Sequence, residues 1–231
     1  MPNQSKPDGR RGEARLPAVV AMVVAIGLQV LLPHQLLVGP RLLLPALELA
    51  ILIPLIAVNP WRLTRQTRWS RPVSIVLVLL ILATNTAILG LLIHALIHGD
   101  AKEGKELLLA ALQVWLTNVI AFGLVYWELD RGGPVVRTQA RRDQIPAADF
   151  RFPQDEDHDA ISEVAKGSSA QSGWVPALVD YLYVSVTNSS AFSPTDTMPL
   201  SSRAKLLMAS QSMSALVLSL LVVSRAVSVL K

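Results

Sequence analysis

The chain has 231 residues, of which 52% are hydrophobic and 16% charged, with a formal net charge of +4 and no cysteine. A mean hydropathy of +0.43 excludes an ordinary soluble domain, and the missing cysteines exclude disulfides, thiolate metal ligands and cysteine nucleophiles. The basic residues gather between apolar runs, as in cytoplasmic loops, and no basic domain of useful size is left to bind nucleic acid. We therefore predict an all-α integral membrane protein.

Five long apolar runs follow a basic N-terminal segment, residues 1–15. Runs of about 18 or more apolar residues predict membrane-spanning helices. The five are Leu16–Leu32, Leu42–Val58, Pro72–His98, Leu107–Trp127 and Ala204–Leu230. The first run resembles a signal peptide, but the HQLLVGP that follows lacks a small-x-small cleavage site, so we expect it to stay as a span. Residues 16–98 then hold three accessory spans, and residues 107–231 form a second module that ends in a helix over 203–230.

One carboxylate, Glu48, lies inside an apolar run, in the middle of the second predicted span. An ionisable residue at membrane depth is costly and by default marks a functional site. Two interpretations stay open: a proton or cation site, or a protonated carboxyl that joins neighbouring helices by hydrogen bonds. Asn85 and Asn118, in the third and fourth spans, are the partners we consider.

Two histidines, His94 and His98, lie four residues apart at the outer end of the third span, near Asp100 and Glu103. The spacing places both imidazoles on one helix face, where they could bind zinc or sense protons. No HExxH motif or further ligand accompanies them, so interfacial histidines are the favoured interpretation. We predict neither a metal nor a cofactor.

Two arginine-rich connections set the expected orientation. One holds Arg62, Arg65, Arg68 and Arg71, between the second and third spans; the other holds Arg131, Arg137, Arg141 and Arg142, after the fourth. Because Lys and Arg accumulate in cytoplasmic loops, both connections and the N-terminus are predicted to be cytoplasmic. The expected location is the bacterial inner membrane, with the lipid bilayer as the surrounding partner.

The fourth span ends in YWELDRGGP, and residues 130–173 beyond it form the one sizeable hydrophilic stretch. Glu128 and Asp130 sit where the helix dipole disfavours anions, so we expect Arg131 or Arg137 to compensate them. The glycine pair and the proline then break the helix.

A pore-like helix and loop is predicted over residues 174–200. At about 100° per residue, one helix face is apolar and carries Val175, Val179, Leu182 and Val186. The other face is polar and carries Asp180, Tyr183, Thr187 and Asn188. Such a face must meet water or protein rather than lipid. It therefore lines a pore or packs against another helix, and both interpretations stay open.

The stretch YVSVTNSSAFSPTDTMP, residues 183–199, resembles the potassium-channel pore loop YFSFTTLTTVGYGDITP. The two share Tyr183, Ser185, Thr187, Asp196 and Pro199. In place of the TVGYG filter the chain has AFSPT, without the glycines that the carbonyl cage requires, so the resemblance implies a pore loop without potassium selectivity. Candidates for the ion pathway here are Ser193, Thr195 and Asp196. Alternatively, Ser193 and Asp196 form an N-cap and first helical turn.

The side from which this loop enters is a second open point. With a cytoplasmic N-terminus the fourth span ends in the cytoplasm, whereas potassium channels insert their pore loop from outside. Either the loop re-enters from the cytoplasm, or residues 174–193 cross fully as a sixth span. We favour re-entry, because irregular polar backbone is tolerated at membrane depth only where protein or water covers it.

The second half of the chain also carries several motifs in a fixed order. They are Trp115, Asn118, YWELDRGG, DFRFP at 149–153, Trp174, Pro176, DYLY, TDT and the helix start at 203–205. This order is similar to that of a group of bacterial inner-membrane proteins of unknown function. The resemblance covers about half the chain and implies a multi-span membrane fold without an established activity.

The function predicted from these features is a channel-like pore, poorly selective among inorganic cations. A homo-oligomer is expected, with a tetramer favoured. The alternatives are a proton- or cation-coupled carrier that uses Glu48 and Asp180, and a non-conducting membrane scaffold. An enzyme is not expected, because no catalytic triad, metal motif or cofactor loop is present.

Overall fold

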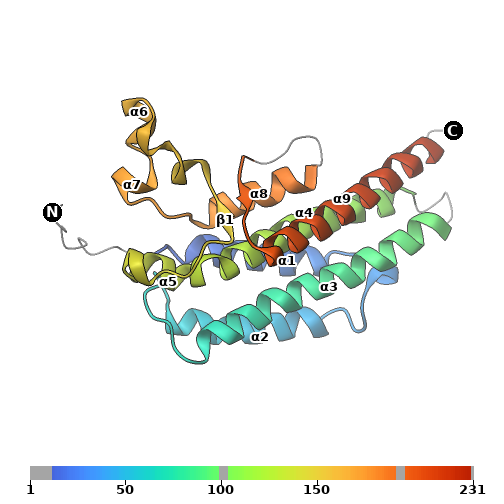
Figure 1. Cartoon of the computed structure of the whole chain (residues 1–231). Helices are drawn as coiled ribbons and strands as arrows, with labels where there is room; N and C mark the ends of the chain where they lie inside the picture. The colour runs from blue at the N-terminus through green and yellow to red at the C-terminus, as the bar shows by residue number, and fades with distance from the viewer. Residues whose placement is uncertain (1–11, 99–103, 191–195, 230–231) are drawn as a thin grey trace, which may run out of the picture.

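The computed structural model describes residues 12–98, 104–190 and 196–229, and most of the described chain is helical. Within it, five helices of fifteen or more residues run roughly along one axis (Figure 1). They are α1 (Leu16–Val30), α2 (Leu43–Val58), α3 (Ser70–His98), α4 (Gly104–Leu129) and α9 (Ser202–Val229). The apolar runs in the sequence therefore predict the helices to within a few residues at each end.

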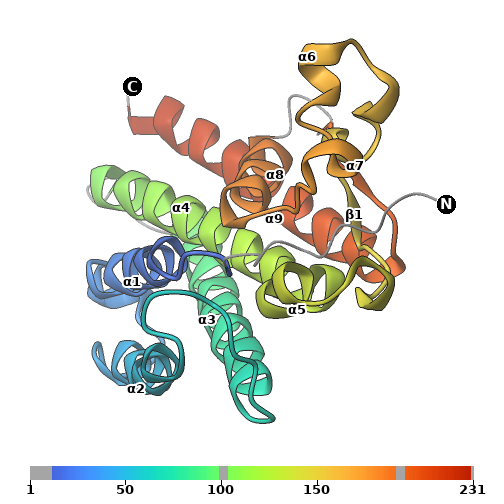
Figure 2. The same cartoon turned by 90° about the vertical axis from the view of Figure 1, so that its left-hand side faces the viewer.

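Helix α4 lies at the centre of this bundle. Figure 2 shows α1, α3, α8 (Leu178–Ser190) and α9 arranged around it, and all four pack against it. A small residue makes the closest approach possible, because a Cβ at Gly123 would lie 2.7 Å from Cδ2 of Leu182 and 3.3 Å from its Cα. The backbone of α8 therefore packs directly on α4.

Three helices, α3, α4 and α9, are long and apolar enough to cross a membrane by length and composition. Helices α1 and α2 are equally apolar but have 15 and 16 residues. At 1.5 Å per residue they measure about 22–24 Å, short of the roughly 30 Å of a hydrocarbon core. The sequence predicts five spans, and three of these helices are long enough to be spans.

Short elements occupy the connections. They are η1 (His34–Leu36), η3 (Asp130–Gly132), α5 (Pro134–Gln139), η4 (Arg142–Gln144), β1 (Phe150–Arg151), η5 (Pro153–Asp155), η6 (Asp157–Asp159), α6 (Ser162–Ala165), α7 (Ser169–Ser172) and β2 (Met198–Pro199). The hydrophilic stretch from 130 to 177 is thus folded, and we call it the connector.

The connector, the N-terminus and the α2–α3 connection all lie at one end of the bundle, which we call the connector end (Figure 1). Ala14 forms an antiparallel bridge with Arg62, and the backbone N–H of Arg15 donates to the carbonyl of Trp61 at 3.1 Å. The described part of the C-terminal helix ends at the opposite end.

An aromatic cluster seats the connector on the bundle. The rings of Phe150 and Tyr126 are 5.1 Å apart edge to face, and Phe152 packs in the same way against Tyr181 and Trp174, with centroid distances of 5.4 and 5.6 Å. Edge-to-face aromatic pairs add about 0.5–1.5 kcal/mol each to the burial of their surface. This is the structural role of the DFRFP motif.

Helix α8 starts at the connector end and runs along α4 and α9 into the bundle. After it, β2 pairs antiparallel with β1, with Phe150 opposite Pro199 and Arg151 opposite Met198. The chain therefore returns, after α8, to the end from which it came.

The break after α4 is a turn of three residues with positive φ. Arg131 has φ 51°, Gly132 80° and Gly133 90°. Glycine adopts these angles without strain, and an arginine adopts them rarely. The predicted helix end is confirmed, and Arg131 lies 3.4 Å from the Asp130 carboxylate, as the compensation of that anion requires.

Candidate functional site

Glu48 is the most deeply placed carboxylate of the apolar part of the bundle. Its side chain is 0% exposed, and its Oε1 accepts a long hydrogen bond, 3.4 Å, from Nε2 of Gln29 on α1. Thr84 of α3 lies beside the same carboxyl. Three helices therefore enclose one ionisable group.

The Glu48 site has few hydrogen-bond donors, namely the Gln29 amide at 3.4 Å and the neighbouring Thr84 hydroxyl. Glu48 Oε2 and Gln29 Oε1 are both buried, and neither has a donor among the residues that the structure describes. An unpaired buried acceptor costs about 1–3 kcal/mol, so two in one place form an unfavourable arrangement unless a further proton, water or ion is supplied.

The partners predicted for Glu48 are wrong. Asn85 donates to Asn118 at 3.2 Å, so the two amides join α3 to α4. The side chains next to Glu48 are those of Gln29 and Thr84. The sequence holds a signal for this, because Gln29 is a polar side chain inside an apolar run. Apolar periodicity alone does not tell which polar side chains in different spans lie at the same depth.

A small gap approaches this site from the end of the bundle opposite the connector. It has a volume of about 20 Å³ and is lined by Gln29, Thr84, Ile88, residues 37–41, Leu44 and Pro45. About 10–15 Å³ suffices for one water molecule. A water can therefore reach the two side chains that neighbour Glu48.

Toward the connector end, apolar side chains separate Glu48 from the next opening. Leu52 is buried one turn along α2, and Leu55 lies about 10 Å from Glu48 along the helix, at seven residues of 1.5 Å rise. Leu55 lines a second cavity, described next. The carboxyl is thus close to one opening and shielded from the other.

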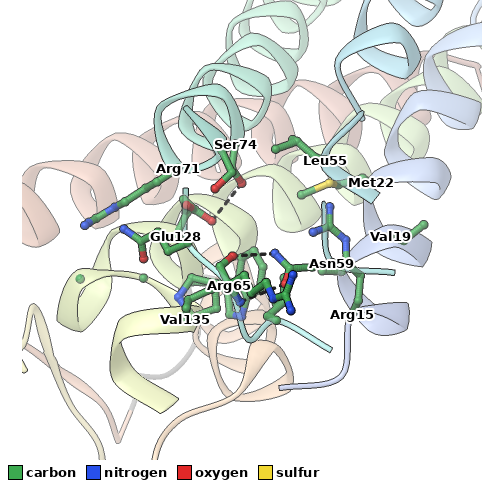
Figure 3. Close-up of a pocket in the computed structure, with 18 residues that line it drawn as sticks. Arg15, Val19, Met22, Leu55, Asn59, Arg65, Arg71, Ser74, Glu128 and Val135 are labelled. Atoms are coloured by element: carbon green, nitrogen blue, oxygen red, sulfur yellow. Dashed lines mark hydrogen bonds between the residues drawn. The ribbon is translucent and has the colours of Figure 1, made fainter. Parts of the chain in front are cut away.

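The connector-end cavity lies between the first turns of α1 and α3, the last turn of α4 and the turn that follows (Figure 3). Its volume is about 40 Å³. Arg15, Arg65, Arg71 and Glu128 line it, and Ser74 donates to Glu128 Oε2 at 3.2 Å. Arg15 is only 8% exposed, and its Nε has no hydrogen-bond partner in the part of the chain that the structure describes.

The polar face predicted for α8 serves mainly for packing and capping. Asp180 accepts a hydrogen bond from the Ala177 N–H at 2.8 Å, so it caps the start of α8. Thr187 bonds to the carbonyl of Tyr183 in its own helix at 2.9 Å, while the ring of Tyr183 is 56% exposed. These candidates for an ion pathway do not converge on one cavity in the described chain.

The fourth member of that face, Asn188, belongs to a buried network that joins α4, α8 and α9. It donates to Oε1 of Gln211 at 2.9 Å, and Tyr126 donates to the same oxygen at 2.6 Å. Gln211 in turn donates to the hydroxyls of Ser185 and Ser189 at 2.6 and 2.7 Å. The helix-packing interpretation therefore fits Asn188, and Gln211 is a central residue that the sequence patterns miss.

The remaining loop candidates are only partly described. Ser193 and Thr195 lie outside the described residues, and Asp196 is exposed. Helix α9 begins at Ser202, and the Ser201 hydroxyl accepts from the Ala204 N–H at 3.2 Å, so Ser201 caps this helix.

His94 and His98 stack with ring centroids 4.4 Å apart, so they share one helix face as predicted. His98 Nδ1 is 3.0 Å from the carbonyl oxygen of His94. Among the described residues no group of three His, Asp or Glu side chains is placed to hold a metal ion. Asp100 and Glu103 lie outside the described residues.

Glu13, which the sequence patterns do not single out, ties the connector end together. Its carboxylate accepts from the indole N–H of Trp127 at 3.0 Å, from the Leu178 N–H at 2.7 Å and from Arg137 at 3.2 Å. Arg137 is fully buried, donates to the Trp127 carbonyl at 2.6 Å and stacks over Tyr181 at 4.9 Å. Arg137 thus compensates the C-terminal end of α4, as expected.

Two further carboxylates hold the connector. Asp149 accepts from Arg203 and Ser201 at the start of α9, at 2.5 Å each. Asp155 accepts from Arg131 at 2.5 Å and from Ser169 at 2.7 Å. Burial by itself raises the pKa of Asp155, but the hydrogen bonds and the charge of Arg131 outweigh it and hold that pKa below its usual value.

Comparisons with known proteins give no match: no family model, no curated protein and no solved structure matches this chain. The resemblance to uncharacterised bacterial inner-membrane proteins therefore stays a prediction. A helical bundle with three helices of spanning length, a carboxylate short of donors and a cavity lined by arginines is what the chain itself provides.

Proposed function

We propose that the chain is a proton-translocating membrane carrier in which Glu48 binds the proton. The proposal is supported chiefly by the donor shortage at Glu48, where two buried acceptor oxygens make no hydrogen bond within the described residues, although the Thr84 hydroxyl lies near. A proton on the carboxyl turns one of these acceptors into a donor. It also removes the cost of a charge in an apolar bundle.

A proton fits this site better than a metal cation. Gln29 presents its amide N–H₂ to the carboxylate, which leaves one carboxylate and one threonine hydroxyl as neighbouring oxygens. Hard cations such as Ca²⁺ require about six or more oxygen ligands. Asp180, the other acid proposed for coupling, is occupied in capping α8 and is not part of this site.

The membrane placement belongs to the same proposal. Arginines crowd the connector end, among them Arg15, Arg62, Arg65, Arg68, Arg71, Arg131, Arg137, Arg141 and Arg142. By the positive-inside rule this end faces the cytoplasm of a bacterial inner membrane. Helices α3, α4 and α9 then cross at full length, the shorter α1 and α2 cross together with the residues that flank them or where the bilayer is thinned, and α8 re-enters from the cytoplasm. In this orientation the gap beside Gln29 opens outward, so Glu48 exchanges protons with the outside in the state that the structure describes.

Proton uptake by liposomes that contain the purified protein tests the function. An inward proton flux under an imposed membrane potential is expected for the wild type and is lost in Glu48→Gln. The amide supplies the missing donor permanently, so this variant is expected to be at least as thermally stable as the wild type.

Glu106→Gln is the matched control, because it makes the same chemical change at an exposed position of α4, and it is expected to keep wild-type flux. If Glu48→Gln conducts protons as the wild type does, the carboxyl only joins helices and the carrier proposal fails.

A cation-conducting oligomeric pore is the second candidate, and the path of α8 favours it. The chain enters along α8 and returns to the same end through β2, which is the connectivity of a re-entrant pore loop. The exposed face of α8, with Val179 and Tyr183, is then free to meet other copies of the chain. A purified particle that is a tetramer and passes Na⁺ and K⁺ at similar rates would support this candidate over the carrier, whereas a monomer excludes it.

A further inference from the structure

The connector-end cavity holds a positive charge that the described chain does not neutralise. Arg15, Arg65 and Arg71 line it against a single carboxylate, Glu128 (Figure 3). Burial lowers the pKa of Arg15, and the charge of Glu128 only partly opposes that shift. The lining therefore has a surplus of two positive charges.

Arg15 is the most deeply buried of the three arginines in this cavity. The residue lines the cavity and is nine-tenths buried, and its Nε has no hydrogen-bond partner in residues 12–98, 104–190 and 196–229. A buried cation without a full set of acceptors costs several kcal/mol unless an anion supplies them. Its backbone, in contrast, is held firmly, because the Arg15 N–H donates to the Trp61 carbonyl at 3.1 Å.

The second arginine is placed by Asn59. The Asn59 side chain accepts from the N–H groups of Thr64 and Arg65 at 3.2 and 3.0 Å and donates to the Arg65 carbonyl at 2.7 Å. One amide thus fixes the loop that carries Arg65 at the mouth of the cavity.

Two long helices direct their N-terminal ends at the same space. Arg15 and Ala18 come from the start of α1, and Ser70 and Arg71 from the start of α3. The positive end of a helix dipole favours an anion, but the C-terminal ends of α2 and α4 line the same cavity and oppose it, so the arginine side chains and not the helix dipoles supply the attraction. The cavity volume of about 40 Å³ has room for about three waters, which matches the three terminal oxygens of a phosphate monoester and leaves the fourth oxygen at the open side.

We propose that this cavity binds a phosphate group, carried either by the headgroup of a phospholipid or by a soluble phosphate compound. Arg15 is the central ligand, and Arg65 and Arg71 complete the charge. A guanidinium group binds two phosphate oxygens at once through its parallel N–H donors, and a single water molecule cannot accept both of these hydrogen bonds. Glu128 opposes the anion and so limits its affinity. This inference does not rest on proton transport by Glu48.

The test is a binding measurement on the purified full chain in detergent and in a buffer that contains no phosphate. Inorganic phosphate is titrated while thermal unfolding is followed, and in a second arm phosphatidylglycerol is added and the bound lipid is counted by native mass spectrometry. Ligand that binds only in the first arm identifies a soluble phosphate, and ligand that binds only in the second identifies a headgroup.

Arg15→Gln is expected to weaken whichever ligand binds by at least tenfold. The substitution removes a buried charge together with its interaction with Glu128, so the unfolding of the ligand-free variant is measured beside that of the wild type. Arg68→Gln, an exposed arginine on the same connection that does not line the cavity, is the matched control and should bind as the wild type does. Glu128→Gln keeps the acceptor for Ser74 and removes the opposing charge, so it should bind more tightly.

Should Arg15→Gln fail to fold, Arg71→Gln replaces it, because Arg71 is half-exposed and lines the same cavity. Equal binding by the Arg15 and Arg68 variants overturns the proposal. So does a wild-type protein that takes up neither inorganic phosphate nor phosphatidylglycerol.

Discussion

Replacing Gln211 by Leu tests the network that joins α4, α8 and α9. The amide is fully buried, accepts from Tyr126 and Asn188, and donates to Ser185 and Ser189. Leucine fills a similar volume and removes every one of these hydrogen bonds. The change therefore isolates the polar contribution from that of packing.

The expected cost follows from which groups keep another partner. Asn188 still donates to the Met208 carbonyl at 2.9 Å, and Ser185 still donates to the Val119 carbonyl at 2.7 Å. The Tyr126 hydroxyl loses the one acceptor found for it among the described residues. An orphaned buried hydroxyl costs about 1–3 kcal/mol, and hydrogen bonds between helices in a bilayer contribute at most about 1.7 kcal/mol.

We therefore expect Gln211→Leu to lower the free energy of unfolding by about 1–2 kcal/mol, or the Tm by about 2–8 °C. The assay is thermal unfolding of the detergent-solubilised protein. Gln113→Leu is the control, because Gln113 is half-buried on α4 and its side chain makes no hydrogen bond among the described residues.

Adding Tyr126→Phe to Gln211→Leu should restore most of the lost stability, because the orphaned hydroxyl is then gone. Equal losses for Gln211→Leu with and without Tyr126→Phe would refute the reasoning. In that case the hydroxyl has another partner, and packing explains the effect.

Four further expectations concern the connector, α8 and conduction. The Asp155 pKa is lower in the folded than in the unfolded chain, so its ion pair with Arg131 stabilises the connector above about pH 4 and is lost as the pH falls through the lowered pKa. Pepsin, which is active in acid, should therefore cleave the wild-type connector faster than its own pH dependence explains as the pH falls, and Asp155→Asn should remove this extra pH dependence. Cysteines introduced singly at Arg65 and Arg141, both exposed at the connector end, should resist impermeant thiol reagents in whole cells. Asp180→Ala should destabilise the start of α8 by about 1 kcal/mol, while Asp180→Asn keeps the capping acceptor and is tolerated in thermal unfolding. Any cation conduction should discriminate weakly between K⁺ and Na⁺ in reversal potentials, because the loop lacks the filter glycines.

Contrary results have definite meanings. Thiol labelling from outside at both positions reverses the orientation. Strong potassium preference contradicts the interpretation of the loop. Cleavage with the same pH dependence in the wild type and in Asp155→Asn shows that Asp155 does not hold the connector, and equal stability of the two Asp180 variants removes the capping role.

The long helices could be predicted because the signal for them is local. An apolar run at Pro72–His98 predicts α3 at Ser70–His98, and the run at Leu107–Trp127 predicts α4 at Gly104–Leu129. The serine cap of α9 is equally local, because the hydroxyl and the N–H it serves lie three residues apart.

The polar contacts inside the bundle could not be predicted in the same way. Tyr126 and Gln211 are separated by 85 positions, and nothing near either residue indicates the other. The same limit explains the wrong partners for Glu48: Asn85 and Asn118 are suitable in type, but their depths on α3 and α4 match each other. The polar face of α8 shows the converse, because periodicity identifies the face and leaves undecided whether water or α9 meets it.

The hydrogen bonds of Glu13 have a consequence for the order of assembly during synthesis. Glu13 leaves the ribosome early, but the Leu178 N–H that it accepts from is made 165 residues later. Arg137 and Trp127 are also made long after α1, α2 and α3. Glu13 is thus fixed last, so an intermediate without α8 should expose the backbone around Glu13 to proteases, and completion of α8 should end that exposure.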